Sequence, residues 1–241
     1  MNTIVTIAVR MKSTRLAGKA MLDIAGQSLI GHLIQRVSKA KRIKAVVLCT
    51  SNLPEDAILL EEAEKYAIGS VAGSADDVFA RFEKAALREG ADHVVRVTGD
   101  NPLTDPEYID RLIGCHLEQK NEYTSVEGLP MGVASEVISV ETLKKGRLAL
   151  QDPTQSEYMT FLLKDTEKYK VGMLKADRGV NRPQYRLTVD TSEDLELIRM
   201  IYRRLYRPEK YFSLQQVVDL MDQYPAFSKI NSEIEQRSLP V

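Results

Sequence analysis

Short apolar runs alternate along the first half of the chain with segments in which apolar residues recur at helical spacing. The short runs predict buried strands at residues 3–9, 45–50 and 93–98. Segments of helical spacing predict helices beginning after Ser28 and covering residues 54–67 and 75–90. This alternation is typical of an α/β protein with a mostly parallel sheet and helices packed against it.

The pattern changes after about Asn121. Two strand-like segments lie close together there, at residues 122–128 and 135–141. The remaining predicted elements are a helix at 153–163, strands at 170–175 and 185–189, a helix from the DTSED segment through Tyr206 and a last helix at 212–223. Since no repeat or linker divides the chain, we predict a single domain over residues 1–241, with a β-rich insertion at about 122–180.

The charge of the chain is nearly balanced, with 33 Lys and Arg residues against 34 Asp and Glu residues. This balance argues against a general nucleic-acid-binding protein, in which a basic excess is usual. Apolar residues make up 44% of the chain, yet no apolar run approaches the length of a membrane span. The chain starts with a strand-like segment and not with a signal peptide, so we expect a cytoplasmic protein in which Cys49 and Cys115 are reduced core thiols.

The segment 9–21, VRMKSTRLAGKAM, concentrates positive charge directly after the first predicted strand. It contains no Asp or Glu, and the first acidic residue of the chain is Asp23. In open α/β sheets this loop often binds phosphate, and Arg, Lys and hydroxyl groups donate to phosphate oxygens. The segment, called the cationic loop below, therefore predicts a phosphate site made by Arg10, Lys12, Ser13, Arg15 and Lys19. The alternative is a solvated basic loop.

Two familiar phosphate-binding motifs do not match the cationic loop. A Walker loop reads Gly-x4-Gly-Lys-Ser/Thr, and Gly18 and Lys19 are present here. However, Ser13 stands at the position of the first glycine and Ala20 at that of the magnesium-binding hydroxyl. The Gly-x-Gly-x-x-Gly fingerprint is also absent, which disfavours an NAD(P)-dependent enzyme.

Two aspartates follow predicted strands far apart in the sequence. Asp100 lies in VTGDNP after the strand at 93–98, and Asp190 lies in TVDT after the predicted strand at 185–189. Carboxylates at two strand ends of one sheet can converge, and Mg²⁺ uses one or two protein carboxylates together with phosphate oxygens and water. We therefore predict that Asp100 and Asp190 hold Mg²⁺. Asp100 ordering the Asn-Pro turn and Asp190 capping the following helix are the alternatives.

Four segments carry a family resemblance over nearly the whole chain: AVRMKSTRLAGKAML, GSADDVFARF, RVTGDNPLTDPEYID and YRLTVDTSEDLELI. Their order and spacing resemble the cytidylyltransferases that activate acidic sugars, including the CMP-sialic acid and CMP-Kdo synthetases. The likeness is greatest to the SpsF-type proteins, whose opening motif reads approximately A-R-x-G-S-T-R-L-P-G-K. The resemblance implies a three-layer α/β/α Rossmann-like nucleotidyltransferase fold with a mostly parallel sheet.

The resemblance also implies the reaction and its residues. A sugar oxygen would attack the α-phosphate of CTP, and pyrophosphate would leave. Arg10, Ser13, Arg15 and Lys19 would hold the triphosphate, and Asp100 and Asp190 would hold Mg²⁺. Ser74 and Arg81 lie where this family reads the base, although Arg81 on a helix is equally compatible with a solvated side chain. Since a metal can lower the pKa of the attacking hydroxyl, no histidine base is needed, and we expect structural or surface roles for His32, His93 and His116.

The chain departs from the family pattern in two regions. Lys12 replaces a glycine and Ala17 replaces a proline in the opening motif, which alters the conformational freedom of the loop. In the acceptor region, LPMGVASEV and SEYMT keep residues of the family motifs, with Tyr158 in place of a histidine. The acceptor-binding residues predicted from this resemblance are Glu136, Glu157 and Tyr158, and a surface position is the alternative for Glu136.

The sequence-based hypothesis is an Mg²⁺-dependent cytidylyltransferase acting on CTP and a small acidic sugar for surface polysaccharide synthesis. One alternative keeps the chemistry but uses a phosphorylated or phosphonate small molecule as acceptor. A second alternative is a non-catalytic nucleotide-binding protein. Only the resemblance suggests a homodimer, to which the insertion would contribute contacts.

Overall fold

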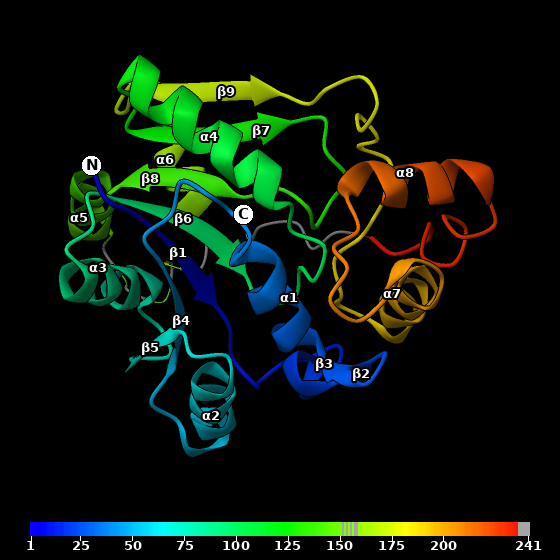
Figure 1. Ribbon diagram of the computed structural model, residues 1–241. Helices are drawn as coiled ribbons and strands as arrows, with labels where there is room; N and C mark the ends of the chain where they lie inside the picture. Colours follow the sequence, from blue (N-terminus) through cyan, green and yellow to red (C-terminus); the bar gives the residue numbers. More distant parts are fainter. Residues whose placement is uncertain (151, 153, 155, 157–158, 236–241) are drawn as a thin grey trace.

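The computed structural model describes residues 1–150, 152, 154, 156 and 159–235. Its central sheet has seven strands in the order β5-β4-β1-β6-β8-β7-β9 (Figure 1). Four parallel strands form one half: β1 (Thr3–Ala8), β4 (Ala45–Ser51), β5 (Gly69–Gly73) and β6 (His93–Thr98). The other half contains β7 (Tyr123–Glu127), β8 (Glu136–Ser139) and β9 (Val171–Lys175). β8 is antiparallel to both neighbours, and β7 and β9 are parallel to each other, so the sheet is mostly parallel, as predicted.

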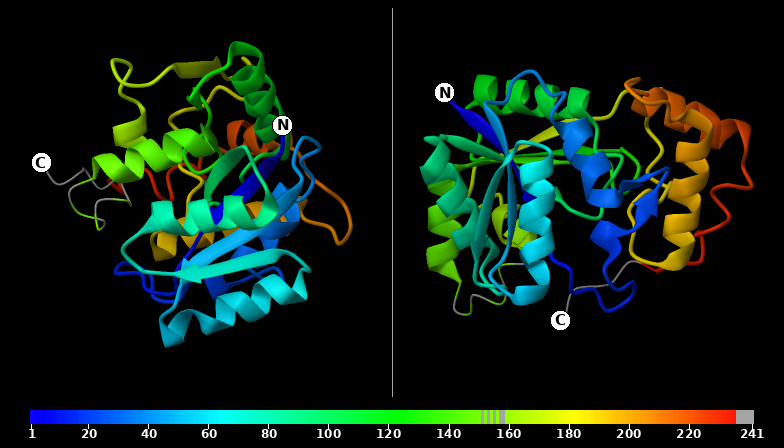
Figure 2. Two further views of the ribbon diagram at one scale, coloured as in Figure 1. Left: turned by 90° about the vertical axis from the view of Figure 1, so that its left-hand side faces the viewer. Right: turned by 60° about the horizontal axis from the view of Figure 1, so that its bottom comes forward.

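Helices cover both faces of this sheet. One face packs against α1 (Leu29–Val37), α2 (Ala57–Lys65) and α4 (Pro106–Gln119). The opposite face packs against α3 (Val78–Glu89), α5 (Val140–Ala149) and α6 (Met159–Leu163). The right-hand view of Figure 2 shows the strands between these two helical layers. The three-layer α/β/α fold implied by the resemblance is therefore confirmed.

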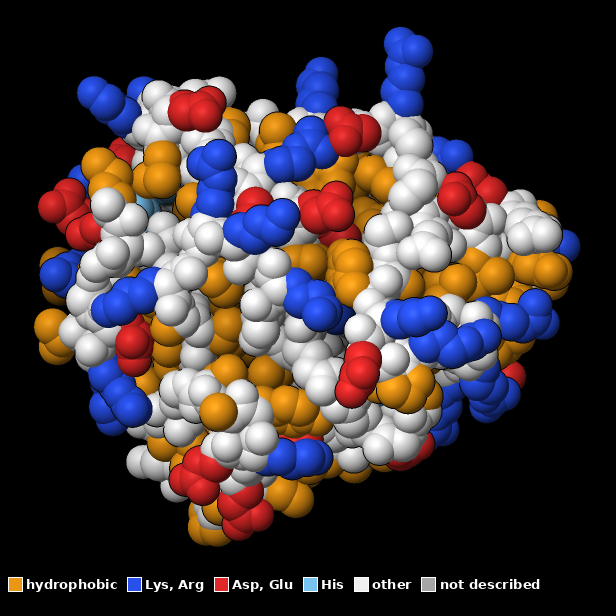
Figure 3. Space-filling view, in the orientation of Figure 1, with side chains coloured by type: hydrophobic (Ala, Val, Ile, Leu, Met, Phe, Trp, Pro, Cys, Tyr) orange, Lys and Arg blue, Asp and Glu red, His pale blue; other side chains and the backbone are white. Residues whose placement is uncertain are grey.

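A third apolar cluster lies beside the sheet, where α7 (Ser192–Leu205) and α8 (Leu214–Gln223) pack together (Figure 1). The cluster also contains Leu103, Val133 and Leu187, which come from three different loops. On the face shown in Figure 3, Lys and Arg side chains gather over the part of the molecule where α7 lies. The α7–α8 unit thus fixes the loops that follow the strands.

The strand predicted at 185–189 is wrong. Within it, Arg186 forms only an isolated bridge with Met131, because the segment pairs with a loop and not with the sheet. The amide of Met131 donates to Tyr185 O at 2.9 Å and that of Leu187 to Met131 O at 2.8 Å. This approach requires Gly132, whose φ is +86° and where a Cβ would lie 2.4 Å from Thr188 N.

Several other elements differ from the sequence-based predictions. The strand predicted at 135–141 ends at Ser139, which caps α5, a helix that the pattern did not predict. β5 was also not predicted, because its sequence GSVAG has only one large apolar side chain. The segment predicted as one helix over 54–67 is a 3-10 turn, η2 (Pro54–Asp56), followed by α2. Of the helix predicted at 153–163, α6 covers the C-terminal part, and residues 153, 155, 157 and 158 lie outside the described residues.

Cys49 is buried in β4, and both cysteines are free thiols. Cys115 is only partly buried and lines a hollow on α4 with Arg111 and Glu118, so its predicted core position is wrong. Among the described helices, none is both long and apolar enough to cross a membrane.

His116 has a structural role, as expected from the sequence. Its side chain is 0% exposed, and its ring nitrogens contact Thr124 Oγ1 at 2.9 Å and His93 Nδ1 at 3.2 Å. Burial and the neighbouring His93 lower the pKa of His116 to about 4. An unfolded chain therefore binds a proton near pH 6.5 that the folded protein does not accept until about pH 4.

This pKa difference predicts acid sensitivity. Above pH 6.5 His116 is neutral in the folded and the unfolded protein and does not reduce the free energy of unfolding. As the pH falls from 6.5 toward 4, only the unfolded chain binds the proton, and the free energy of unfolding decreases. The expected loss is about 2 kcal/mol between pH 7 and pH 5. Unfolding free energies measured at both pH values should show a smaller pH dependence in His116→Gln than in the wild type. An NMR titration that gives His116 an ordinary pKa in the folded wild type would contradict the prediction.

Candidate active site

The cationic loop and both aspartates meet at the carboxyl ends of β1 and β6. These two strands run side by side over their whole length. The loop turns at Gly18, whose φ is +64°, into the 3-10 helix η1 (Lys19–Met21). The amide of Val189 donates to Asp100 O at 2.9 Å, which places Asp190 beside Asp100 although their segments are distant in sequence. The convergence predicted for the two carboxylates is therefore present.

Lys19 joins the two aspartates. Its Nζ donates to Asp100 Oδ2, to Asp190 Oδ1 and to the carbonyl oxygen of Val189, each at 2.9 Å. The Lys19 side chain is 15% exposed. Burial works against its charge, but Asp100 and Asp190 outweigh burial and raise the pKa of the ammonium group. Lys19 therefore carries its charge throughout the physiological pH range.

Asp190 contacts three cationic side chains of the site. Besides Lys19, it contacts Arg15 Nη2 at 2.9 Å through Oδ1 and Arg186 Nη2 at 2.9 Å through Oδ2. Its side chain is 11% exposed, and burial favours the neutral acid, but Lys19, Arg15 and Arg186 together lower its pKa. Asp190 is therefore ionised, and it does not cap α7, because Thr191 occupies that position.

Arg186 and Asp194 hold Asp190 in position through hydrogen bonds to its side chain and its backbone amide. Arg186 Nε donates to Asp194 Oδ1 at 2.9 Å, and Asp194 Oδ2 accepts from the amides of Asp190 and Thr191 at 2.9 and 3.1 Å. The sequence analysis did not select Arg186. The sequence nevertheless contained a signal for this ion pair. Arg186 stands four positions before Asp190 in the short segment that leads into α7.

Asp100 is oriented by the turn that follows β6. Thr98 Oγ1 donates to Asp100 Oδ1 at 2.7 Å and accepts from Asn101 Nδ2 at 2.8 Å. At Gly99 a Cβ would lie 2.5 Å from the Cβ of Val9, so this glycine allows the loops after β1 and β6 to touch. Asp100 thus orders the Asn-Pro turn and also joins Lys19, and the two readings of its role are compatible.

The donor chemistry of Asp100 and Asp190 fits a divalent cation. Because Lys19 Nζ lies 2.9 Å from an oxygen of each, these oxygens are no farther apart than twice that distance. Mg²⁺ is usually held by one or two carboxylates and completes its octahedron with water and phosphate oxygens. Among the residues that the structure describes, no group of three or more His, Cys, Asp or Glu side chains is arranged to hold a metal. An ion shared between two aspartates and a nucleotide suits this set.

Arg15, Lys19, Arg186, Asp100, Asp190 and Asp194 are called the ion-pair cluster below. The other residues of the cationic loop lie outside it. Arg10 reaches toward the segment before α3, where its Nη1 donates to Ala75 O at 3.1 Å. Ser13 Oγ accepts from the amide of Leu16 at 3.3 Å. Lys12 is exposed and takes no part in the ion pairs of Asp100 and Asp190. The structure thus divides the five loop residues into a pair at the aspartates and three along the rest of the loop.

Asp56 anchors the start of the cationic loop. It is buried, and its carboxylate accepts from the amide of Met11 at 2.6 Å and from the hydroxyl of Ser51. We expect Asp56→Asn to raise KM for the nucleoside triphosphate that the family resemblance implies about tenfold with a smaller change in kcat, because a charge-assisted hydrogen bond contributes about 1.5–3 kcal/mol. Steady-state kinetics would measure this, with the exposed neighbour Glu55→Gln as control. An unchanged KM for the nucleotide would show that the loop does not depend on this anchor.

Arg81, predicted near the base, is buried and not solvated. Its Nη1 donates to Cys49 O at 3.3 Å, and its Nε has no hydrogen-bond partner within the described residues. Burial lowers the pKa of the Arg81 guanidinium, and the charge of Arg10 acts in the same direction. Ser74 Oγ accepts from the amide of Asp76 at 3.2 Å and so orders the turn before α3. Arg10 thus contacts the segment that contains Ser74, and Arg81 packs against Gly73, the residue before it.

Glu136, predicted to contact the acceptor, is not a surface residue. Its side chain is 14% exposed, and Oε2 contacts Arg96 Nη1 at 3.2 Å and Thr160 Oγ1 at 2.9 Å. The hydrogen bond to Thr160 joins the two predicted acceptor motifs, since Thr160 belongs to SEYMT. Glu157 and Tyr158 lie outside the described residues. Sequence reasoning did not select Arg96, although its position on β6 two residues before Thr98 places it on the same face of the strand.

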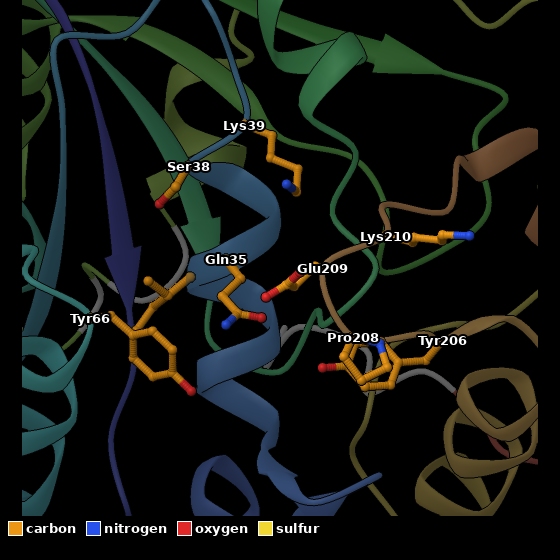
Figure 4. Close-up of a pocket in the computed structure, with 9 residues that line it drawn as sticks. Gln35, Ser38, Lys39, Tyr66, Tyr206, Pro208, Glu209 and Lys210 are labelled. Atoms are coloured by element: carbon orange, nitrogen blue, oxygen red, sulfur yellow. The ribbon is translucent and has the colours of Figure 1, made fainter.

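A groove on the described surface lies away from the ion-pair cluster. Its volume is about 540 Å³, and it lies between α1 and the segment after α7, lined by Gln35, Lys39, Tyr66, Tyr206 and Lys210 among others (Figure 4). None of the ion-pair residues lines it. We place the active site at the ion-pair cluster and not in this groove, because the cluster combines charge, burial and strand-end position.

Comparisons with known proteins find similar sequences and structures. A sequence profile of the family described as Cytidylyltransferase matches residues 4–219. The chain is 33% identical over 226 residues to the spore coat polysaccharide biosynthesis protein SpsF of Bacillus subtilis, covering 91% of this chain and 93% of SpsF. It is 34% identical over 116 residues to the 3-deoxy-manno-octulosonate cytidylyltransferase of Geobacter sulfurreducens, covering 47% of this chain and 44% of that enzyme. A solved cytidylyltransferase from Leptospira borgpetersenii superposes with a TM-score of 0.86 at 26% identity and 98% coverage of both chains.

Proposed function

Since the chain belongs to the cytidylyltransferase family of nucleotidyltransferases, we propose that it transfers CMP from CTP to an acidic sugar, with Mg²⁺ as cofactor. An oxygen of the sugar attacks the α-phosphorus, the bond to the bridging oxygen breaks and pyrophosphate leaves, while the attacking hydroxyl loses its proton. The observation that carries this proposal is the convergence of Arg15, Lys19, Asp100 and Asp190 within direct contact distance.

The basic and the acidic residues of the site have different proposed roles. Arg15 and Lys19 place positive charge beside the phosphates, where it offsets the charge that develops on the leaving pyrophosphate. Asp100 and Asp190 would hold the Mg²⁺, which would supply further charge neutralisation and lower the pKa of the attacking hydroxyl. Arg10 and the outer loop residues Lys12 and Ser13 extend the phosphate site, and Ser74 with Arg81 receives the base.

The acceptor side is proposed for the insertion at about 122–180, which is part of the same single domain. Glu136, held by Arg96 and Thr160, contributes a carboxylate on β8, next to β6, the strand that precedes Asp100. Glu157 and Tyr158 complete the proposed acceptor set. The relatives include a protein of spore coat polysaccharide biosynthesis and a cytidylyltransferase of an eight-carbon sugar acid. These names favour an acidic sugar of surface polysaccharide synthesis. The proposal also includes a cytoplasmic location and a homodimer, which extend the expectations from the sequence.

Pyrophosphate release tests the proposal directly. The purified protein is incubated with Mg²⁺, one nucleoside triphosphate and one acceptor from a panel of eight-carbon and nine-carbon acidic sugars. We expect release with CTP and at least one sugar acid, with CTP preferred over UTP, ATP and GTP. Release only with phosphorylated or phosphonate acceptors would replace the acceptor class. CTP binding without release across both panels would identify a non-catalytic nucleotide-binding protein.

A further inference from the structure

Lys19 uses all of its hydrogen-bonding capacity inside the ion-pair cluster. An ammonium group has three N–H donors. The three acceptors of Lys19 are Asp100 Oδ2, Asp190 Oδ1 and Val189 O, all at 2.9 Å. A lysine in this arrangement has no donor left for a phosphate oxygen, although its charge and position suit one. Lys19 must therefore give up at least one of these three acceptors before one of its N–H groups can bind a triphosphate.

Each carboxylate oxygen of Asp100 and Asp190 also has at least one partner. Asp100 Oδ1 accepts from Thr98 and Oδ2 from Lys19. Asp190 Oδ1 accepts from Lys19 and contacts Arg15, and Oδ2 contacts Arg186. A cation that approaches both aspartates meets the Lys19 ammonium between them, with its positive charge. Metal binding to the pair and the present position of Lys19 therefore exclude each other.

The charge balance of the ion-pair cluster links triphosphate binding by Lys19 to metal binding by Asp100 and Asp190. Three carboxylates of the cluster, on Asp100, Asp190 and Asp194, face three cations, on Arg15, Lys19 and Arg186. A divalent cation added alone would give this partly buried cluster an excess of positive charge. A triphosphate added alone would approach two carboxylates. Only the two together supply opposite charges to a site whose own charges are balanced.

We propose that Lys19 is an exchangeable cation, which holds Asp100 and Asp190 together and releases them to the metal as its ammonium group turns to the phosphates. This inference rests on the proposed function of the same site. It assigns Lys19 a second task besides phosphate binding, namely preventing the aspartates from binding a divalent cation without a nucleotide. Metal and triphosphate then bind with positive coupling, since each favours the same rearrangement of Lys19.

The experiment measures Mn²⁺ binding without turnover. Electron paramagnetic resonance of free Mn²⁺ gives the affinity of the protein, with and without a CTP analogue that has a methylene group between the α- and β-phosphates. For the wild type we expect the analogue to increase Mn²⁺ affinity at least about tenfold beyond the binding of Mn²⁺ to the analogue itself. In Lys19→Met, Mn²⁺ affinity without analogue should rise about tenfold, and the coupling should shrink.

The matched control is Lys41→Met, which removes the same charge from an exposed side chain outside the cationic loop and the ion pairs. It should leave Mn²⁺ affinity without analogue within about twofold of the wild type. A Lys19→Met protein with unchanged or weaker Mn²⁺ affinity overturns the inference. If that variant does not fold, the wild-type measurement still decides, because independent binding of Mn²⁺ and analogue excludes the exchange. If one of these results overturns the exchange of Lys19 but the wild type releases pyrophosphate, the proposed function still holds. If the wild type does not bind CTP, both the exchange and the proposed function are wrong.

Discussion

Asp190→Asn is expected to lower kcat/KM for CTP about a thousandfold, because the amide cannot replace the ionised carboxylate that meets Lys19, Arg15 and Arg186. The substitution keeps the shape of the side chain but places an amide donor among three cations. It also removes one of the two carboxylates proposed for Mg²⁺, so more Mg²⁺ should be needed for half-maximal activity. The fold should remain intact, since Thr191 and Asp194 form the capping box of α7 without Asp190.

Pyrophosphate release over a range of Mg²⁺ concentrations measures both effects, and circular dichroism checks the fold. The matched control is Asp222→Asn on α8, another carboxylate that pairs with an arginine, Arg182, outside the ion-pair cluster. That variant should keep wild-type activity. If Asp190→Asn unfolds the protein and the folded remainder has normal specific activity, Asp190 has only a structural role.

The parts of the site that depend on strand ends could be predicted from sequence. The cationic loop and Asp100 each follow a strand rich in Val or Ile, and β1 and β6 are adjacent in the sheet. Since parallel strands end at the same edge, their following loops had to meet. Asp190 was placed correctly for a different reason from the one expected. Its segment is not a strand of the sheet but is held by the hydrogen bond from Val189 to Asp100 O.

The sequence pattern carried little information about contacts between irregular segments. The partner of residues 185–189 is the loop around Met131, and the requirement for Gly132 arises from backbone approach and not from hydrophobic periodicity. Arg186 pairs with Asp190 and Asp194 only because this loop pairing turns its side chain toward α7. Likewise, the burial of Arg81 depends on β5, whose short and weakly apolar sequence gave no signal of a strand.

The saturated contacts of Lys19 were also beyond sequence reasoning. Residue type and position predicted a phosphate-binding lysine, and the family resemblance agreed. A sequence does not show how many donors of an ammonium group are already in use. The three simultaneous contacts of Lys19 with two distant segments exist only in the packed structure. They are the reason for proposing that Lys19 exchanges with a metal ion.

Asp194→Ala is expected to cost about 3–5 kcal/mol of unfolding free energy, the largest stability loss predicted for the site. The side chain is 0% exposed, and it accepts from Arg186, from the amides of Asp190 and Thr191 and from Asn231 Nδ2. Its loss leaves the buried Arg186 with one carboxylate instead of two, and leaves buried amide donors without their acceptor. The free energy of a helix cap adds to this cost.

Urea denaturation of the wild type, Asp194→Ala and Glu193→Ala measures the difference. Glu193 is an exposed carboxylate in the same first turn of α7, so its replacement should change the unfolding free energy by less than about 0.5 kcal/mol. A matched loss in both variants would mean that the charge at the start of α7, and not the contacts of Asp194, stabilises the helix. A loss below about 1 kcal/mol in Asp194→Ala would mean that water satisfies Arg186 and the freed amides equally well. In that case Arg186 would remain free to hold Asp190, and activity would survive together with stability.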